Sequence, residues 1–286
     1  KPMPGATSNP FKEQIVEDID SQLNPDYTFE NYCISDSNKV ARSIGEAIAN
    51  DPKLQTFNPL FVFGPCGVGK THLIQAIGIR IKERNPRARV LYITARLFES
   101  QYTAAVQRSK VNEFINFYQS IDTLIIDDIQ DFIGKDKTQK TFYHIFNHLK
   151  QNHRQLIMSS DCCPSQMEGM QDRLLSRFKS GMTAQLEKPD LDLRRDVLTQ
   201  KSLRDGLSLP REVMDFIASN VTESIRELEG VVVSLLAHAT FLDKDISVEL
   251  ARRVLSNSVK LNKRTVNFET IARQVSAFYN IETDQI

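Results

Sequence analysis

The sequence lacks an excess of charge of either sign. Lysine and arginine together number 36, aspartate and glutamate together also number 36, and the formal net charge is zero. Proteins that attract nucleic acid through their overall field carry a clear positive excess. Any binding of nucleic acid by this chain must therefore come from local groups of basic residues.

A long apolar run and a leader segment are also missing. The longest apolar stretch, residues 231–242, is interrupted by polar side chains and is shorter than the roughly 20 residues that cross a bilayer as a helix. No signal peptide opens the chain, which begins at Lys1 instead of a methionine. We therefore expect no membrane span in this chain, and we expect the chain to be a piece of a longer protein.

Cysteines are few and do not form metal-binding or redox pairs. None of the four has the C-x-x-C spacing. The neighbours Cys162 and Cys163 could not form an ordinary disulfide without strain. Free thiols, together with the phosphate-binding loop described next, favour a cytoplasmic location.

What the sequence does contain is a phosphate-binding loop. Residues 60–63 predict a buried strand, residues 72–82 predict a helix, and the full pattern G-x-x-x-x-G-K-[ST] lies between them. Glycines let backbone N–H groups approach phosphates, the lysine reaches the β- and γ-phosphates, and the hydroxyl can hold Mg²⁺. The residues expected to bind a nucleoside triphosphate are Gly64, Gly67, Gly69, Lys70 and Thr71.

Apolar strands alternate with helical segments as far as residue 188, which predicts an α/β fold with a five-stranded parallel sheet flanked by helices. The expected strands are residues 60–63, 89–93, 123–128, 155–159 and 182–186. Beyond Pro189 only helical spacing remains, so a small all-helical domain is expected there. The predicted division is an acidic flexible linker at 1–26, a nucleotide-binding domain at 27–188, a helical domain at 189–256, and a basic connector with one further helix at 257–286.

Carboxylates end two of the expected strands, where open α/β sheets bind ligands. We expect Asp127 to hold Mg²⁺, and Asp128 to orient or deprotonate the attacking water. Adjacent strand residues point to opposite faces, so both can act only if the strand ends there; the alternative is a pair of solvated acids. Asp161 ends the next strand and either meets the γ-phosphate region or caps a helix that begins at Pro164.

Three arginines lie at positions that suggest phosphate recognition. Arg173 and Arg177 are four residues apart on one helix face, from which a guanidinium could reach a neighbour's phosphate; a solvated helix face is the alternative. Arg226 lies in the first turn of a helix, where a cation opposes the helix dipole. His144 and His148 have a metal-like spacing but lack the accompanying glutamate, so we expect no metal there.

Together these motifs resemble the AAA+ ATPases and, more closely, the DnaA family of bacterial chromosomal replication initiators. The resemblance covers about residues 27–286. The segments that carry it are Asn58–Phe61, Lys70–Leu73, Ile126–Gln130, Arg173–Phe178 and Arg226–Gly230.

The resemblance implies a doubly wound ATPase domain with a helical lid, which binds ATP or ADP with Mg²⁺ and hydrolyses ATP slowly as a switch. It implies a cytoplasmic protein that oligomerises with ATP on origin DNA and promotes duplex opening. It implies that Asp161 is sensor 1, near the γ-phosphate, and that Arg226 is sensor 2, on the helical lid. It also implies that Arg177 is the arginine finger, which contacts the ATP of a neighbouring subunit, and that Arg173 supports the subunit contact. It also places residues 29–32 near the adenine.

The same resemblance implies a grip on single-stranded DNA through two helices within residues 98–118, with Thr103, Lys135 and Lys137. This chain departs from the usual pattern at Thr103, Asp131 and Lys137. A lysine neutralises phosphate but lacks the fork of an arginine, so we expect a weaker or differently arranged grip. The last expected helix resembles the start of a domain that reads duplex origin boxes. A replicative helicase, bound through an N-terminal region, is a further implied partner.

Two other functions remain open at this point. A helicase loader or a regulator of the initiator would share the ATPase core, although it would not need the basic connector toward a duplex-reading domain. An ordinary P-loop enzyme or motor would leave Arg177, Arg226 and the helical domain without a role.

Overall fold

The computed structural model describes residues 19–53, 55–242 and 245–258. It divides into two compact units, Lys1–Glu187 and Lys188–Ile286. The expected linker up to residue 18, the basic residues at 260–264 and the expected last helix all lie outside the described residues.

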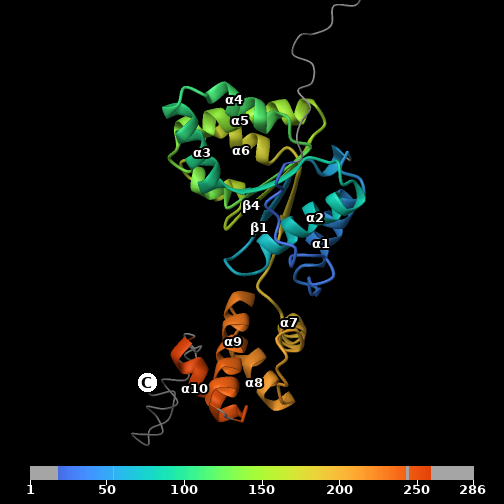
Figure 1. The fold of residues 1–286 in the computed structure, drawn as a ribbon, viewed down its shortest axis with the longest axis vertical. Coiled ribbons are helices and arrows are strands. Elements are labelled where there is room, and N and C mark those ends of the chain that lie inside the picture. The colour runs from blue at the N-terminus through green and yellow to red at the C-terminus, as the bar shows by residue number, and fades with distance from the viewer. Residues whose placement is uncertain (1–18, 54, 243–244, 259–286) are drawn as a thin grey trace, which may run out of the picture. The chain divides into compact units, whose positions relative to one another are not determined.

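A parallel sheet forms the centre of the first unit (Figure 1). Its order is β2-β3-β4-β1-β5, which confirms the predicted five-stranded α/β architecture. Apolar runs dominate the inner strands because a parallel sheet is covered on both faces, and every residue of β3 and β4 is buried. The edge strand β5 is more polar and only partly buried. The strands are β1 (Leu60–Phe63), β2 (Val90–Thr94), β3 (Thr123–Asp127), β4 (Gln155–Ser160) and β5 (Met182–Gln185).

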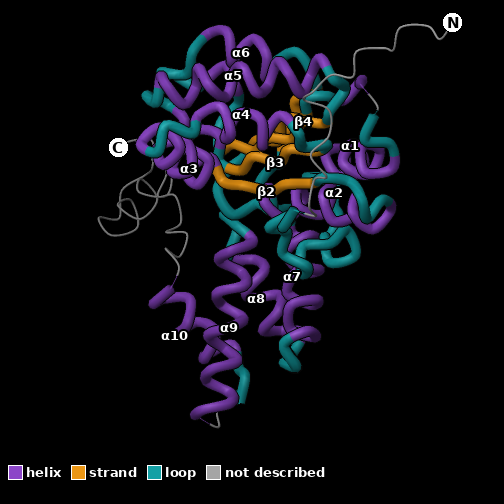
Figure 2. Tube along the Cα trace, turned by 45° about the horizontal axis from the view of Figure 1, so that its top comes forward, coloured by secondary structure: helices purple, strands orange, loops and turns teal. Residues whose placement is uncertain are grey.

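Two layers of helices cover the two faces of the sheet (Figures 1 and 2). On one face lie α1 (Lys39–Asn50) and α2 (Lys70–Arg84), which share a core with Leu60 and Val62 of β1. The alternate residue Phe61 points to the other face. The helices that build that second core are α3 (Ala95–Gln107), α4 (Val111–Gln119), α5 (Asp136–Gln151) and α6 (Asp172–Phe178).

The serines at 35 and 37 predict a helix start there, with Val40, Ile44, Ala47 and Ile48 on its apolar face, but the first helix begins later, at Lys39. Asn38 precedes α1, and its side chain accepts a hydrogen bond from the Ser35 N–H and donates one to the Cys33 carbonyl. The Asn38 side chain therefore stabilises the turn that precedes this helix. Ile44 and Ile48 are buried as expected, whereas Val40 is 60% exposed and Ala41 is buried in its place.

The second unit is all-helical within its described residues. Its helices are α7 (Leu191–Arg204), α8 (Arg211–Asn220), α9 (Ile225–Leu242) and α10 (Val248–Ser258). They pack around a separate core that includes Leu198, Ile217 and Val231. In the part of the chain that the structure describes, no helix has the length and apolar character needed to cross a membrane.

Candidate nucleotide site

The phosphate-binding loop connects β1 to α2 at the carboxyl end of the sheet. Gly67 and Gly69 have φ values of 76° and 98°, which glycine adopts at little cost. Helix α2 begins at Lys70, two residues earlier than its apolar pattern indicates. Lys70 and Thr71 therefore lie in its first turn, where unpaired N–H groups and the helix dipole favour an anion.

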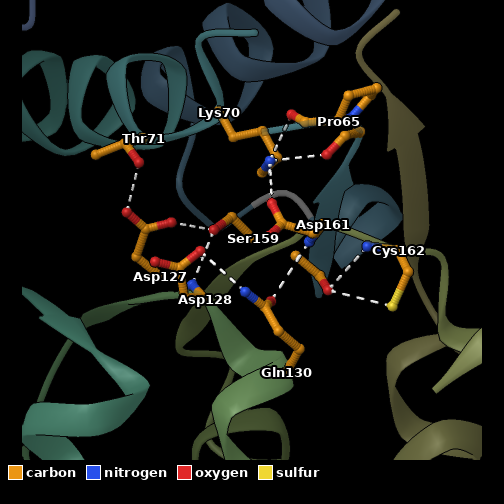
Figure 3. Close-up of polar contacts among 11 residues, drawn as sticks. Pro65, Lys70, Thr71, Asp127, Asp128, Gln130, Ser159, Asp161 and Cys162 are labelled. Atoms are coloured by element: carbon orange, nitrogen blue, oxygen red, sulfur yellow. Dashed lines mark hydrogen bonds and ion pairs between the residues drawn. The ribbon is translucent and has the colours of Figure 1, made fainter. Parts of the chain in front are cut away.

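The Lys70 ammonium group is buried and has three acceptors (Figure 3). Its Nζ donates to the carbonyls of Gly64 and Pro65, at 2.7 and 2.8 Å, and lies 2.6 Å from Asp161 Oδ1. Strands β1 and β4 are neighbours in the sheet, which brings the loop and Asp161 together. The alternative in which Asp161 caps the turn at Pro164 is wrong, since Cys163 occupies that cap position.

Asp127 ends β3 as a buried carboxylate that accepts three hydrogen bonds. The Thr71 hydroxyl donates to Oδ2 at 2.7 Å, the Tyr92 hydroxyl donates to the same oxygen at 2.9 Å, and the Ser159 hydroxyl donates to Oδ1. Burial, followed by the charge of Asp127, raises the pKa of Tyr92, so this phenol remains a donor. Three donors make a buried charge tolerable and fix the orientation of the carboxylate.

Asp128 does not continue the strand. It follows the last residue of β3 with φ 56° and ψ 49°, in the left-handed region, so both carboxylates can serve one site. Its N–H donates to Ser159 Oγ at 3.1 Å, and Gln130 Nε2 donates to its Oδ1 at 3.1 Å. Gln130 Oε1 accepts from the Asp161 N–H at 3.4 Å, so the Gln130 side chain links the ends of β3 and β4.

Burial raises the pKa of the Asp128 carboxyl above its ordinary value, and the charges of Asp127, Asp161 and Asp131 act in the same direction, while the Gln130 hydrogen bond lowers it. The folded chain therefore holds this proton more tightly than the unfolded chain does. Stability is lost as the pH rises from the ordinary carboxyl pKa through the raised one.

Replacement of Asp128 by asparagine removes that cost, and asparagine tolerates the left-handed backbone. For the nucleotide-free chain we expect Asp128→Asn to raise Tm at neutral pH by roughly 1–2 °C, with no gain near the ordinary carboxyl pKa. Thermal unfolding of the variant and the original chain, from the ordinary carboxyl pKa up to neutral pH, measures the difference in Tm. Asp192→Asn, at an exposed carboxylate of the second unit that lies 3.8 Å from Arg195, is the control. An equal rise in Tm at every pH would mean that asparagine stabilises the left-handed backbone at this position, and that the carboxyl charge is not the cause.

Tyr92, Ser159 and Gln130 were not singled out as site residues from the sequence. The signal that could have found Tyr92 and Ser159 is a polar side chain within an otherwise apolar buried strand, because such a group needs a partner. Gln130 lies in a short turn after β3, and its link between Asp128 and Asp161 depends on the order of the strands.

The two arginines of α6 meet over one aromatic ring. The guanidinium carbon of Arg173 lies 4.7 Å from the ring centroid of Tyr143 on α5, and that of Arg177 lies 6.0 Å from it. Arg173 also donates twice to Gln171 Oε1, at 2.9 and 2.7 Å. Both arginines are exposed. They lie on the same side of α6, as their spacing predicts, and both contact the ring of Tyr143.

The residues expected to contact DNA lie around α3 and the start of α5. Thr103 is exposed and lines a shallow surface pocket of about 420 Å³, together with Arg96 and Glu99. Lys135 pairs with Glu99 at 3.0 Å, so its charge is partly neutralised, whereas Lys137 is exposed in the first turn of α5. Arg96, absent from the sequence prediction, adds a cation, and its Nε lies 3.8 Å from Asp131.

Two further predicted regions have a clear place in the fold. Phe29 and Tyr32 are buried, and His72, the residue after Thr71, contacts Tyr32 edge-on with ring centroids 5.1 Å apart. Residues 29–32 thus adjoin the start of α2. Arg226 is exposed in the first turn of α9, in the second unit.

Comparison with known proteins gives consistent matches. Residues 23–185 match the family model of the bacterial DnaA ATPase domain. The chain is 52% identical over 276 residues to the chromosomal replication initiator protein DnaA of Bacteroides fragilis, a match that covers 96% of this chain and 58% of that protein. The chain therefore spans somewhat more than half the length of the curated relatives it matches.

Solved structures agree with this result. Domain III of the replication initiation protein DnaA from Thermotoga maritima is similar with a TM-score of 0.80 at 37% identity, covering 83% of this chain and 99% of that one. A replication initiator DnaA bound to AMPPCP and single-stranded DNA is similar with a TM-score of 0.70 at 28% identity, covering 91% and 95% of the two chains.

Proposed function

The chain belongs to the DnaA family of bacterial chromosomal replication initiators, and from this premise we propose that it is an ATP-dependent switch for assembly on origin DNA. In this proposal ATP joins neighbouring copies, the assembly engages single-stranded DNA and promotes duplex opening, and slow hydrolysis resets it. A relative of known structure is bound to an ATP analogue and single-stranded DNA, which supports both ligands.

For the nucleotide, the N–H groups around Gly67 and Gly69 cradle the phosphates and Lys70 contacts the β- and γ-phosphates. The Thr71 hydroxyl and Asp127 Oδ2 lie 2.7 Å apart, and two adjacent oxygen donors fit a Mg²⁺ shell. Bound Mg²⁺ would neutralise phosphate charge. Tyr92 and Ser159 also donate to this carboxylate and so orient it toward Thr71.

For hydrolysis, Asp128 orients or deprotonates the attacking water and Asp161 meets the γ-phosphate region. An aspartate reaches one methylene less far than a glutamate, which favours slow turnover. Arg226 reads the nucleotide from the chain's own helical domain, and Arg177 reads it from the neighbouring copy, with Arg173 at the subunit contact. Slow turnover and a trans-acting arginine suit a switch better than a motor.

For DNA, the exposed side of α3 and the start of α5 contact single strands. Lys137 and Arg96 provide charge there, while Thr103 contributes a small polar side chain. Lys135 contributes less, because Glu99 pairs with it. Duplex origin boxes would be read beyond this chain, and a replicative helicase would bind through an N-terminal region.

The observation that carries the switch proposal is the exposed arginine pair on α6, since a guanidinium supplied by one copy can contact the phosphate bound by its neighbour. Particle mass with an ATP analogue or ADP, with and without a single-stranded oligonucleotide, tests it. We expect oligomers with the analogue, larger ones with the oligonucleotide, and monomers with ADP. Equal assembly with both nucleotides would overturn the gating role. Binding to a helicase without binding to DNA would favour a loader or regulator.

Arg177→Ala isolates the trans contact. We expect it to weaken assembly with the ATP analogue roughly tenfold or more, since a hydrogen bond between charged groups contributes about 1.5–3 kcal/mol. Nucleotide affinity of the monomer should remain, which equilibrium titration measures. Lys179→Ala is a matched control at a residue that directly follows α6. A loss of monomer affinity equal to the loss of assembly would place Arg177 in the chain's own site.

A further inference from the structure

We propose that Tyr143 is a positioning residue, whose ring holds the Arg177 guanidinium ready for the nucleotide of a neighbouring copy. The inference rests on the proposed function, because it requires Arg177 to act in trans. It adds a role for a residue of α5 that contacts neither nucleotide nor DNA in that proposal.

The geometry is that of two guanidinium groups close to one aromatic ring. Arg173 and Arg177 are successive along one face of α6, and their guanidinium carbons lie 4.7 and 6.0 Å from the Tyr143 ring centroid. Both distances fall within the range of a cation–π interaction. A tyrosine ring loses little rotamer freedom when it serves as a platform.

The platform is fixed by the core beneath it. Phe142 and Phe146, on either side of Tyr143 along α5, are fully buried and contact Phe178 at the end of α6, with centroid distances of 6.5 and 6.3 Å. These contacts set the distance between α5 and α6. The core thus fixes the helix that carries Tyr143 against the helix that carries Arg177.

The surrounding charge explains why a platform is needed. Arg177 lies near Arg173 and near Lys150, whose pKa is lowered by burial and then by the Arg177 charge. Among the described residues, no carboxylate forms an ion pair with Arg173 or Arg177. A hydrogen bond with Asn147, followed by one with Arg177, lowers the pKa of Tyr143.

Held cations of this kind bind an incoming anion at a smaller entropic cost. A free arginine samples many rotamers, and ordering them weakens the contact that it makes. Repulsion from Arg173 and Lys150 would turn an unsupported Arg177 toward solvent. The ring face of Tyr143 opposes this, so the guanidinium remains over α5 before a neighbouring copy arrives.

The test compares Tyr143→Leu with Tyr143→Phe in the full chain. Leucine removes the ring, whereas phenylalanine keeps the ring face and removes only the hydroxyl. We expect Tyr143→Leu to raise the concentration needed for assembly with an ATP analogue roughly two- to fivefold per contact. Tyr143→Phe should have a smaller effect, because it loses only the hydroxyl that bonds Arg177 and keeps the ring beneath both guanidinium groups. Thermal unfolding and monomer nucleotide affinity verify that both variants are folded.

A mixing experiment identifies the side of the contact that is affected. Lys70→Ala chains cannot provide a nucleotide but keep Tyr143 and Arg177. Tyr143→Leu chains that hold the analogue are mixed with these Lys70→Ala chains. They should pair with them as well as unaltered chains do, because the Arg177 that contacts the analogue then comes from the Lys70→Ala chain, where Tyr143 still holds it in place.

Three results would decide against the inference. The first is normal assembly of Tyr143→Leu where Arg177→Ala fails to assemble. The second is a loss of assembly in Tyr143→Phe as large as that in Tyr143→Leu. The third is pairing in the mixture that is as weak as the pairing of Tyr143→Leu chains with one another. If Arg177→Ala itself assembles normally, the proposed function fails, and the inference fails with it. The two failures are thus distinguishable.

Discussion

Replacement of Lys70 by alanine is expected to lower the affinity of the chain for ATP by about 100-fold or more. Each hydrogen bond between charged groups contributes about 1.5–3 kcal/mol, and the lysine reaches two phosphates. In the free chain its ammonium group already lies among the carbonyls of Gly64 and Pro65 and the carboxylate of Asp161. Equilibrium titration with ATP at constant Mg²⁺ measures the loss.

Asp161→Ala is the matched comparison for that variant. It removes the partner of the lysine but leaves the lysine and its two carbonyl contacts. Because the Asp161 side chain is 47% exposed, water can take its place beside the lysine, and we expect ATP affinity to change much less than in Lys70→Ala. Nearly unchanged affinity in Lys70→Ala would mean that the loop N–H groups and the α2 dipole hold the phosphates alone.

The fold and the phosphate loop could be predicted because each depends on a local pattern. The strands around Leu60, Leu124 and Leu156 are continuous apolar runs, and a parallel sheet covered on both faces gives such runs. The loop is a contiguous set of glycines followed by Lys70. In both cases the residues that interact with the ligand or core lie next to one another along the chain.

The polar network around Asp127 could not be predicted in the same way. Tyr92 and Ser159 reach this carboxylate from β2 and β4, the strands on either side of β3. Which strands are neighbours depends on the order of the sheet, which no local pattern provides. The late start of α1 has another cause, since Asn38 forms two side-chain hydrogen bonds that compete with an earlier helix start.

Replacement of Asp127 by asparagine is expected to lower ATP hydrolysis by about 100- to 1000-fold. The change removes the negative charge proposed to hold Mg²⁺, and a metal ion contributes several kcal/mol to transition-state stabilisation. It also disturbs a buried network. Thr71, Tyr92 and Ser159 all donate to the carboxylate, whereas the amide has a single acceptor oxygen and introduces N–H groups. Unmatched hydroxyls should lower stability by about 1–3 kcal/mol.

Tyr92→Phe separates these two effects, because it removes one donor while it keeps the charge of Asp127. We expect Tyr92→Phe to retain most hydrolysis and its dependence on Mg²⁺, whereas Asp127→Asn loses both. Phosphate release across a Mg²⁺ titration measures hydrolysis, and thermal unfolding without nucleotide measures the cost to the network. If Asp127→Asn hydrolyses ATP within about tenfold of the original chain, with the same Mg²⁺ dependence, Asp128 is the carboxylate that holds the ion. The left-handed turn after β3 would then serve to bring Asp128, and not Asp127, to the metal.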